Sequence, residues 1–203
     1  MSSDALFRII QSFVFVAFIA NRAYYNRKFP PAEEDTIEKQ SETTLTKIAN
    51  YFSILALISL LIYLIVPRYL IWASLPLPTW VRWVGVLLAL DGFALLFWSH
   101  AALGENWSDQ PRITTEQKFI SEGPYRWIRH PIYTAFIAIL GSSLLITSNW
   151  LVGGLWLVIT SVDIAPRIKF EEEMVLEKFG EQYRSYLNRT GALLPHILMG
   201  KKN

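Results

Sequence analysis

Residues 123–133 of the chain read GPYRWIRHPIY and stand where a polar loop meets an apolar segment. Pro124 and Pro131 fix the backbone φ angle at two points, and each proline also restricts the residue before it. The same stretch supplies guanidinium and imidazole donors, together with tyrosines that combine an aromatic face with a hydroxyl tip. This combination predicts a pocket at a membrane edge that holds a polar, partly anionic cofactor.

The composition is that of a membrane protein. Of the 203 residues, 52% are hydrophobic and only 18% are charged, whereas soluble domains carry about 25% charged residues. We therefore expect a single integral membrane domain of the all-α class over residues 1–203. A net charge of +2 with scattered basic residues argues against a nucleic-acid partner. The chain has no cysteine, and its three histidines (His100, His130 and His196) are too dispersed for a metal-binding motif.

Five apolar runs predict five transmembrane helices, since a helix needs about 20 residues to cross a bilayer. They cover about residues 5–20, 48–66, 81–103, 132–146 and 150–165. Residues 29–47 are expected to be a solvated linker. The last two runs are short and separated only by Thr147–Asn149, so they predict a helical hairpin.

The segment after Pro166 predicts an amphipathic helical tail that lies back on the membrane domain. Its apolar positions, which include Phe179, Tyr183 and Tyr186, alternate with charged residues. Gly180 is expected to end one helix and to allow a second to follow.

Lysine and arginine indicate which loops face the cytoplasm. Five follow the first apolar run, four lie in residues 104–130 and seven follow Ala165, whereas only Arg8, Arg68 and Arg82 fall on the other side. Cytoplasmic loops carry an excess of such residues. We therefore expect the N-terminus outside, the C-terminus in the cytoplasm and a site at residues 123–133 that faces the cytoplasm.

Asp91 lies near the middle of the third apolar run. An ionisable group at this depth is costly and usually faces protein. We favour a hydrogen bond to a neighbouring helix over a catalytic role for this side chain.

Asp163, Arg167 and Glu171 are spaced four residues apart, which places them along one face of a helix, although Pro166 could kink it. One interpretation is an ion-pair ladder that carries a charged segment out of the membrane. The other is an arginine that binds a carboxylate bidentately while an acidic neighbour holds it.

Two other groups also allow two interpretations. His130 alone would be a structural hydrogen bonder, but its position beside Arg129, Pro131 and Tyr133 favours contact with a ligand. Asn106 and Trp107 either anchor a helix end at the membrane interface or contribute to a site.

The order and spacing of these residues resemble the isoprenylcysteine carboxyl methyltransferases and their prokaryotic relatives. The similar pieces are Gly123-x-Tyr125-x-x-x-Arg129-His130-Pro131-x-Tyr133, then Arg167-x-x-x-Glu171-Glu172, Phe179-Gly180-x-x-Tyr183-x-x-Tyr186 and Leu194-Pro195. The resemblance covers about residues 103–195. It implies that residues 1–103 supply N-terminal spans and that residues 104–195 form the cofactor-binding and catalytic half.

The resemblance also implies S-adenosyl-L-methionine as the cofactor, bound on the cytoplasmic side without a metal. The implied cofactor contacts are Tyr125, His130, Pro131, Tyr133 and Glu171, with Gln110, Gln117, Lys118, Phe119 and Ile120 matched by position rather than by identity. Arg167 corresponds to the arginine that contacts the substrate, and with Glu171 it forms the expected catalytic pair. The implied substrate is a lipid-like or isoprenylcysteine-like carboxylate that is reached from the membrane lipids.

Other functions remain open from the residues alone. One is a membrane reductase similar to the sterol reductases that binds NADPH, although no additional basic cluster for a 2′-phosphate is evident. A phospholipid amine is an alternative methyl acceptor, and a scaffold without enzymatic activity is a third possibility. The sequence specifies neither the acceptor nor the oligomeric state.

Overall fold

The computed structural model describes residues 3–29, 44–107 and 118–196, and within these ranges the regular structure is entirely helical. The described residues form six α-helices. The α-helices are α1 (Ser3–Lys28), α2 (Thr44–Ile65), α3 (Thr79–Leu103), α4 (Pro131–Thr147), α5 (Trp150–Phe179) and α6 (Glu181–Arg189). Short 3₁₀ helices lie between α2 and α3, namely η1 (Pro67–Ala73), and between α3 and α4, namely η2 (Gly104–Asn106) and η3 (Gly123–Arg126).

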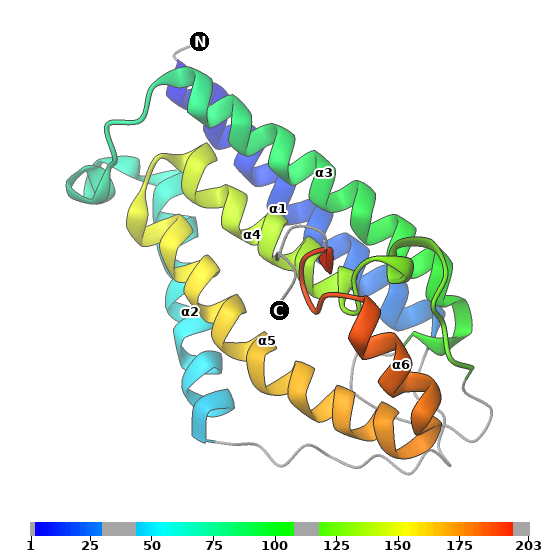
Figure 1. The fold of residues 1–203 in the computed structure, drawn as a ribbon. Coiled ribbons are helices and arrows are strands. Elements are labelled where there is room, and N and C mark those ends of the chain that lie inside the picture. The colour runs from blue at the N-terminus through cyan, green and yellow to red at the C-terminus, as the bar shows by residue number, and fades with distance from the viewer. Residues whose placement is uncertain (1–2, 30–43, 108–117, 197–203) are drawn as a thin grey trace.

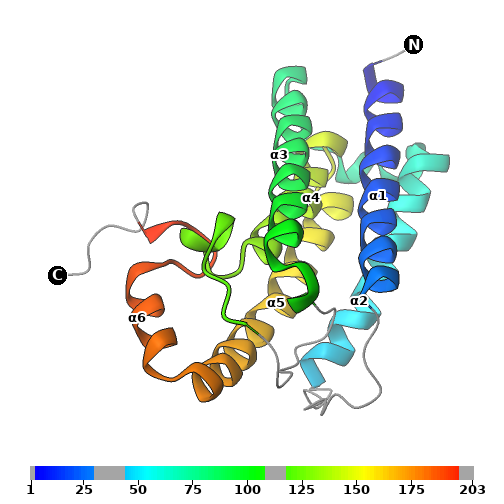
Figure 2. The same ribbon diagram turned by 90° about the vertical axis from the view of Figure 1, so that its right-hand side faces the viewer.

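Helix α4 lies at the centre of the arrangement, with α1 and α3 on one side and α5 on the other (Figure 1). Helix α2 packs against the outer side of α5. One core cluster forms where α1, α3 and α4 meet, with Phe18, Leu96, Ala135 and Ile139 buried together. The second half of α5 runs out of this bundle and carries α6 back toward residues 118–130 (Figure 2).

The helices confirm an all-α membrane fold. Three are long and apolar enough to cross a bilayer, namely α1, α3 with its 3₁₀ extension to Asn106, and α5. Part of α2 passes the same test only together with η1, from which it is bent by 116°. Helix α4 is also apolar but has only 17 residues, fewer than any of these candidate spans. The described helices thus provide three to four candidate spans, and the number five stays a prediction.

The predicted hairpin is present between α4 and α5. Ser148 takes the left-handed conformation (φ 52°) at the end of α4. Asn149 begins α5, and its Oδ1 accepts hydrogen bonds from the backbone N–H groups of Leu151 and Val152, both at 3.1 Å. Its Nδ2 donates to the carbonyl of Leu70 at 2.9 Å, so the turn is also tied to η1. This capping explains why so short a connection is sharply defined.

Helix α5 continues through Pro166, whereas the sequence predicted a membrane span that ends at Ala165. A proline inside a helix removes a backbone hydrogen bond and costs about 3 kcal/mol. Packing maintains the helix on both sides of the proline, because Ile164 and Met174 are buried. Gly180 then ends α5 with φ +53° and donates its N–H to the carbonyl of Leu176, as predicted.

The expected partner for Asp91 on a neighbouring helix is not found, because Asp91 is exposed on α3. The buried positions of α3 include Gly85, Ala89, Gly92 and Leu96, which form one stripe along the helix. Asp91 lies outside this stripe, and the apolar run around it carries no signal that reveals which face packs.

Gly153 sits where α5 crosses α4 most tightly. A Cβ atom at this position would lie 2.0 Å from the Cα of Leu144, whereas a Cβ at Gly154 would meet nothing within 4 Å. Gly153→Ala is therefore expected to lower the free energy of unfolding in detergent by roughly 2–3 kcal/mol. Gly154→Ala, the matched control, should be neutral or stabilising by about 0.5–1 kcal/mol. Equal stability of the two variants would show that the helices are less tightly packed than the structure indicates.

Candidate active site

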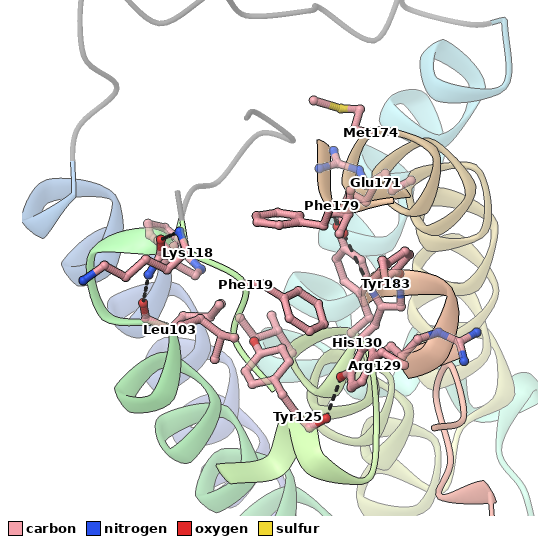
Figure 3. Close-up of a pocket in the computed structure, with 18 of the residues that line it drawn as sticks. Leu103, Lys118, Phe119, Tyr125, Arg129, His130, Glu171, Met174, Phe179 and Tyr183 are labelled. Atoms are coloured by element: carbon pink, nitrogen blue, oxygen red, sulfur yellow. Dashed lines mark hydrogen bonds and ion pairs between the residues drawn. The ribbon is translucent and has the colours of Figure 1, made fainter. Parts of the chain in front are cut away.

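A cavity of about 210 Å³ lies at the end of the bundle where α5 and α6 meet residues 118–133. Figure 3 shows Phe119 and Tyr125 between Lys118 and Leu103 on one side and His130, Glu171 and Tyr183 on the other. The wall also includes Arg22 from α1 and Asn106 from η2. Segments that are distant in sequence therefore line one pocket.

The stretch 123–133 folds into a 3₁₀ turn that leads directly into α4. Gly123 has φ +58°, and a Cβ there would lie only 3.2 Å from the Cβ of Ala102, so both conformation and space favour glycine. Tyr125 is buried, and its carbonyl accepts a hydrogen bond from the Tyr186 hydroxyl. Pro131 occupies the first turn of α4, where its missing N–H has no cost.

Arg129 ties this stretch to the C-terminal segment. Its Nε donates to Glu172 Oε1 at 2.7 Å, and its Nη1 donates to the carbonyls of Thr190 and Leu187. Its backbone N–H also donates to the carbonyl of Gly191 at 2.9 Å. Because these partners belong to α5 and to residues 187–191, Arg129 connects the stretch 123–133 to both segments.

His130 lies between two carboxylates. Its Nδ1 is 3.4 Å from Glu171 Oε2, and its Nε2 is 3.2 Å from Glu172 Oε1. Burial alone would lower the pKa of His130, but the hydrogen bonds to Glu171 and Glu172 outweigh burial and raise this pKa above its ordinary value. Glu171 also accepts a hydrogen bond from the Tyr133 hydroxyl. The Glu171 carboxylate is therefore fixed in the cavity wall from two sides.

Aromatic rings form the other wall of the cavity. The ring of Phe119 has its centroid 5.5 Å from Phe179, 6.0 Å from Tyr183 and 5.2 Å from Tyr186. Burial raises the pKa of Tyr186 to about 12, and burial together with the charge of Glu171 raises that of Tyr125 well above its usual value. Both tyrosines are thus protonated at neutral pH and can donate hydrogen bonds, but they cannot serve as bases.

Arg167 and Asp163 form the predicted ion pair on α5, with Arg167 Nε 3.2 Å from Asp163 Oδ2. Arg167 and Glu171 both line the cavity, one helical turn apart. The Arg167 side chain is 30% exposed, so its guanidinium remains accessible to a ligand. Among the described contacts only the first pair of the predicted ladder forms, because Glu171 contacts His130 and Tyr133 instead of Arg167. The Asp163–Arg167 pair is compatible with the carboxylate-binding interpretation, since Arg167 also lines the cavity.

Most of the residues that the sequence singled out lie in this cavity. They are Lys118, Phe119, Ile120, Tyr125, His130, Tyr133, Arg167 and Glu171. Pro131 is buried at the start of α4 and does not line the cavity. Gln110 and Gln117 lie outside the described residues.

The structure adds wall residues that the sequence did not single out as site residues, among them Arg22, Arg129, Phe136, Met174, Phe179, Tyr183 and Tyr186. The spacing of Phe179, Tyr183 and Tyr186 in an otherwise charged tail is a signal that could have identified three of them. Asn106 also lines the cavity, and its Oδ1 accepts a hydrogen bond from the backbone N–H of Lys118 at 3.0 Å.

The raised pKa of His130 gives an expected pH dependence of stability. The protonated imidazole stabilises the fold fully below its unfolded pKa of about 6.5, and this contribution is lost as the pH rises through the higher folded pKa. Unfolding in detergent at several pH values should therefore show that His130→Gln lowers stability most at about pH 6 and less at higher pH. A stability difference that grows with rising pH would contradict this arrangement of charges.

The helical fold and the apolar spans define a multi-pass integral membrane protein with a cavity at the end of its helix bundle. The sequence model of the isoprenylcysteine carboxyl methyltransferase (ICMT) family matches residues 83–177. This match covers just under half of the chain, and individual members of the family are also similar to it.

Two relatives and one solved structure illustrate the range of similarity. Methanethiol S-methyltransferase of Mycobacterium tuberculosis is 30% identical over 131 residues, which are 63% of this chain and 49% of that protein. Protein-S-isoprenylcysteine O-methyltransferase B of Arabidopsis thaliana is 25% identical over 165 residues, 79% of this chain and 83% of that protein. The chain thus spans about half the length of the mycobacterial protein.

The solved structure is that of the eukaryotic intramembrane Ras methyltransferase ICMT. It is 22% identical to this chain and superimposes with a TM-score of 0.53, covering 80% of this chain and 55% of that one. This similarity concerns the fold, and it agrees with the helical arrangement described above.

Proposed function

We propose that the chain is a membrane methyltransferase that transfers a methyl group from S-adenosylmethionine to a lipid-like or isoprenylcysteine-like carboxylate. The observation that carries this proposal is the placement of Arg167 and Glu171 one turn apart in a single cavity with residues 118–133. Arg167 then provides a cation for the acceptor, and Glu171 provides an anion for the cationic methyl donor, within one cavity. The printed names of the relatives, which are methyltransferases, support the same reaction class.

The residues of the cavity fit this cofactor. The fixed carboxylate of Glu171 suits an ammonium or sulfonium group, and the rings of Phe119 and Tyr183 offer faces for a flat base. Lys118 lines the opposite side of the cavity, and an ammonium there suits the cofactor's own carboxylate. When bound, the cofactor supplies an electrophilic methyl group on its sulfonium.

The protein's contribution is to bind, orient and exclude water. Arg167, oriented by Asp163, is positioned to hold the acceptor carboxylate through two parallel hydrogen bonds. No general base is required, because a carboxylate is already ionised at neutral pH. This agrees with buried tyrosines that stay protonated. Catalysis then rests on positioning two reactants in a dry site.

We further propose that α2 with η1 and also α4 complete five membrane crossings, with the cavity on the cytoplasmic side. The support is the charge distribution, since residues 104–130 and the segment after Ala165 carry most of the basic residues. Described residues of both segments, among them Lys118, Arg129 and Arg167, line the cavity. An acceptor with a lipid tail would then enter from the bilayer, and the cofactor would enter from water.

The function is tested by transfer of tritiated methyl groups to a panel of farnesylated acceptors that carry a carboxylate, a thiol or an amine. The purified full chain in detergent is expected to methylate the carboxylate most efficiently. Transfer to the amine alone would exclude the proposed acceptor. If the protein binds NADPH and does not bind S-adenosylhomocysteine, the methyltransferase proposal is wrong and a reductase is favoured.

A further inference from the structure

Helix α3 lies at the edge of the bundle and leaves one of its faces exposed (Figures 1 and 2). The opposite face, which contains Gly85 and Gly92, packs closely against α4. The exposed face consists of positions that are alternately four and three residues apart, namely Trp80, Val84, Leu87, Asp91, Ala94 and Trp98. One carboxyl group therefore lies at the centre of an otherwise apolar face.

Asp91 is at the middle of the candidate span. It is 12 residues from both Thr79 and Leu103, the first and last residues of α3, which corresponds to about 18 Å along the helix in each direction. Trp80 and Trp98 are exposed toward the two ends, and tryptophan is typical of the membrane–water interfaces. In a hydrocarbon core about 30 Å thick, Asp91 thus faces outward near the bilayer centre.

A carboxyl group at this depth requires a partner. Ionisable side chains inside a bilayer are costly and almost always face protein or pair with one another. No hydrogen bond or ion pair joins Asp91 to another described residue of the chain. The apolar positions of the face suit lipid, but Asp91 does not. Spacings of four and three residues also allow two helices to pack along a common seam, so the face fits a second transmembrane helix.

We propose that α3 pairs with α3 of a second copy of this chain, and that the two Asp91 side chains form a hydrogen bond at the centre of the bilayer. Two copies cross the membrane in the same direction, so a two-fold axis along the membrane normal places both carboxyl groups at one depth. One carboxyl group then donates a hydrogen bond to the other. A second copy is favoured as the partner because it necessarily carries a polar group at this depth.

The residue one turn after Asp91 supports close pairing of the helices. Ala94 is exposed on the same face, and small residues let the backbones of two transmembrane helices approach each other. The interface lies outside the cavity, because none of its residues lines the cavity wall. The proposed pairing is therefore independent of the reaction that the cavity performs.

Disulfide cross-linking tests the pairing directly, since the chain contains no cysteine of its own. Two cysteines are bridged only when their Cα atoms come within about 7 Å. The full-length Ala94→Cys variant, reconstituted in phosphatidylcholine vesicles at a low protein-to-lipid ratio, is expected to form a covalent dimer on mild oxidation. Leu87→Cys, one turn before Asp91, should do the same. Val158→Cys is the matched control, because Val158 is 60% exposed on α5, and it should remain monomeric.

Substitutions of Asp91 in the Ala94→Cys variant test the hydrogen bond. Asp91→Leu should weaken association about tenfold, as measured by dilution with lipid, which is the amount expected for one hydrogen bond between helices in a membrane. Asp91→Asn should stay within about twofold of the parent, because an amide also forms hydrogen bonds across helices. Both substitutions lie on the exposed face, so a thermal scan in detergent should show that both variants fold.

Three results would overturn the proposal. Equal cross-linking of Ala94→Cys and Val158→Cys would show that α3 is not a specific interface. Unchanged association of Asp91→Leu would remove Asp91 from the interface. Absence of covalent dimers of Ala94→Cys and Leu87→Cys with the purified chain would mean that lipid or another protein covers this face of α3.

Discussion

Replacing Arg167 with methionine is expected to lower methyl transfer to a carboxylate acceptor by roughly a hundredfold or more, with little change in S-adenosylhomocysteine affinity. The guanidinium is the cavity group best placed to hold the acceptor, since Asp163 orients it from the preceding turn of α5. Two charge-assisted hydrogen bonds would be lost at once. The loss is measured by the rate of tritiated methyl transfer and by calorimetric titration with S-adenosylhomocysteine.

Lys169→Met provides the matched control for Arg167→Met. Lys169 lies two residues further along α5, its side chain is 81% exposed, and its partner Glu173 is on the surface. It should retain normal transfer and normal cofactor binding. An equal loss of transfer and of S-adenosylhomocysteine binding in Arg167→Met would assign Arg167 to the cofactor side of the cavity and refute its role as the acceptor ligand.

Arg129→Met is expected to lower the free energy of unfolding by about 3–5 kcal/mol, the largest stability effect among the variants considered. The substitution removes the 2.7 Å ion pair with Glu172 and the donors to the Thr190 and Leu187 carbonyls. Glu172 would then stay half-buried with only His130 as a partner. Chemical denaturation in detergent measures the loss, and proteolysis after Gly180 reports whether α6 separates from the bundle.

Arg126→Met is the control, because Arg126 is exposed three residues earlier on the same stretch. It should unfold like the wild type. If Arg129→Met is as stable as Arg126→Met, the C-terminal segment is not held by Arg129, and the cavity wall must be maintained by other contacts.

Much of the fold follows from the sequence because a helix that crosses a lipid bilayer needs a long run of apolar residues. The runs that predicted the third and fourth spans match α3 and α4 within about two residues, and the connection Thr147–Asn149 predicted the turn between α4 and α5. The end of α5 could not be predicted, because its continuation through Pro166 depends on packing around Ile164 and Met174. The prediction that Asp91 contacts a neighbouring helix was wrong for a related reason. The sequence of a uniformly apolar helix does not reveal which of its sides is buried.

The candidate site divides in the same way. Tyr125, His130, Tyr133, Arg167 and Glu171 belong to short motifs whose order and spacing resemble those of a known family, so local sequence was sufficient to find them. Lys118, Phe119 and Ile120 were matched only by their position relative to these motifs. Arg22 and Phe136 meet only because α1 packs on α4, and they are more than a hundred residues apart. In the sequence, Arg22 is one of several basic residues after an apolar run, and such residues are typical of a cytoplasmic helix end.

The central claim is that residues 118–133 and helices α5 and α6 form one binding site for the methyl donor. Calorimetric titration of S-adenosylhomocysteine into wild type, Glu171→Gln and Glu173→Gln tests it most directly. Glu171 lines the cavity, whereas the Glu173 side chain is 65% exposed on the same helix. We expect micromolar binding to wild type and Glu173→Gln, and affinity about tenfold weaker for Glu171→Gln, the loss of one charged contact. No binding to folded wild-type protein, or equal binding to all three, would contradict this site.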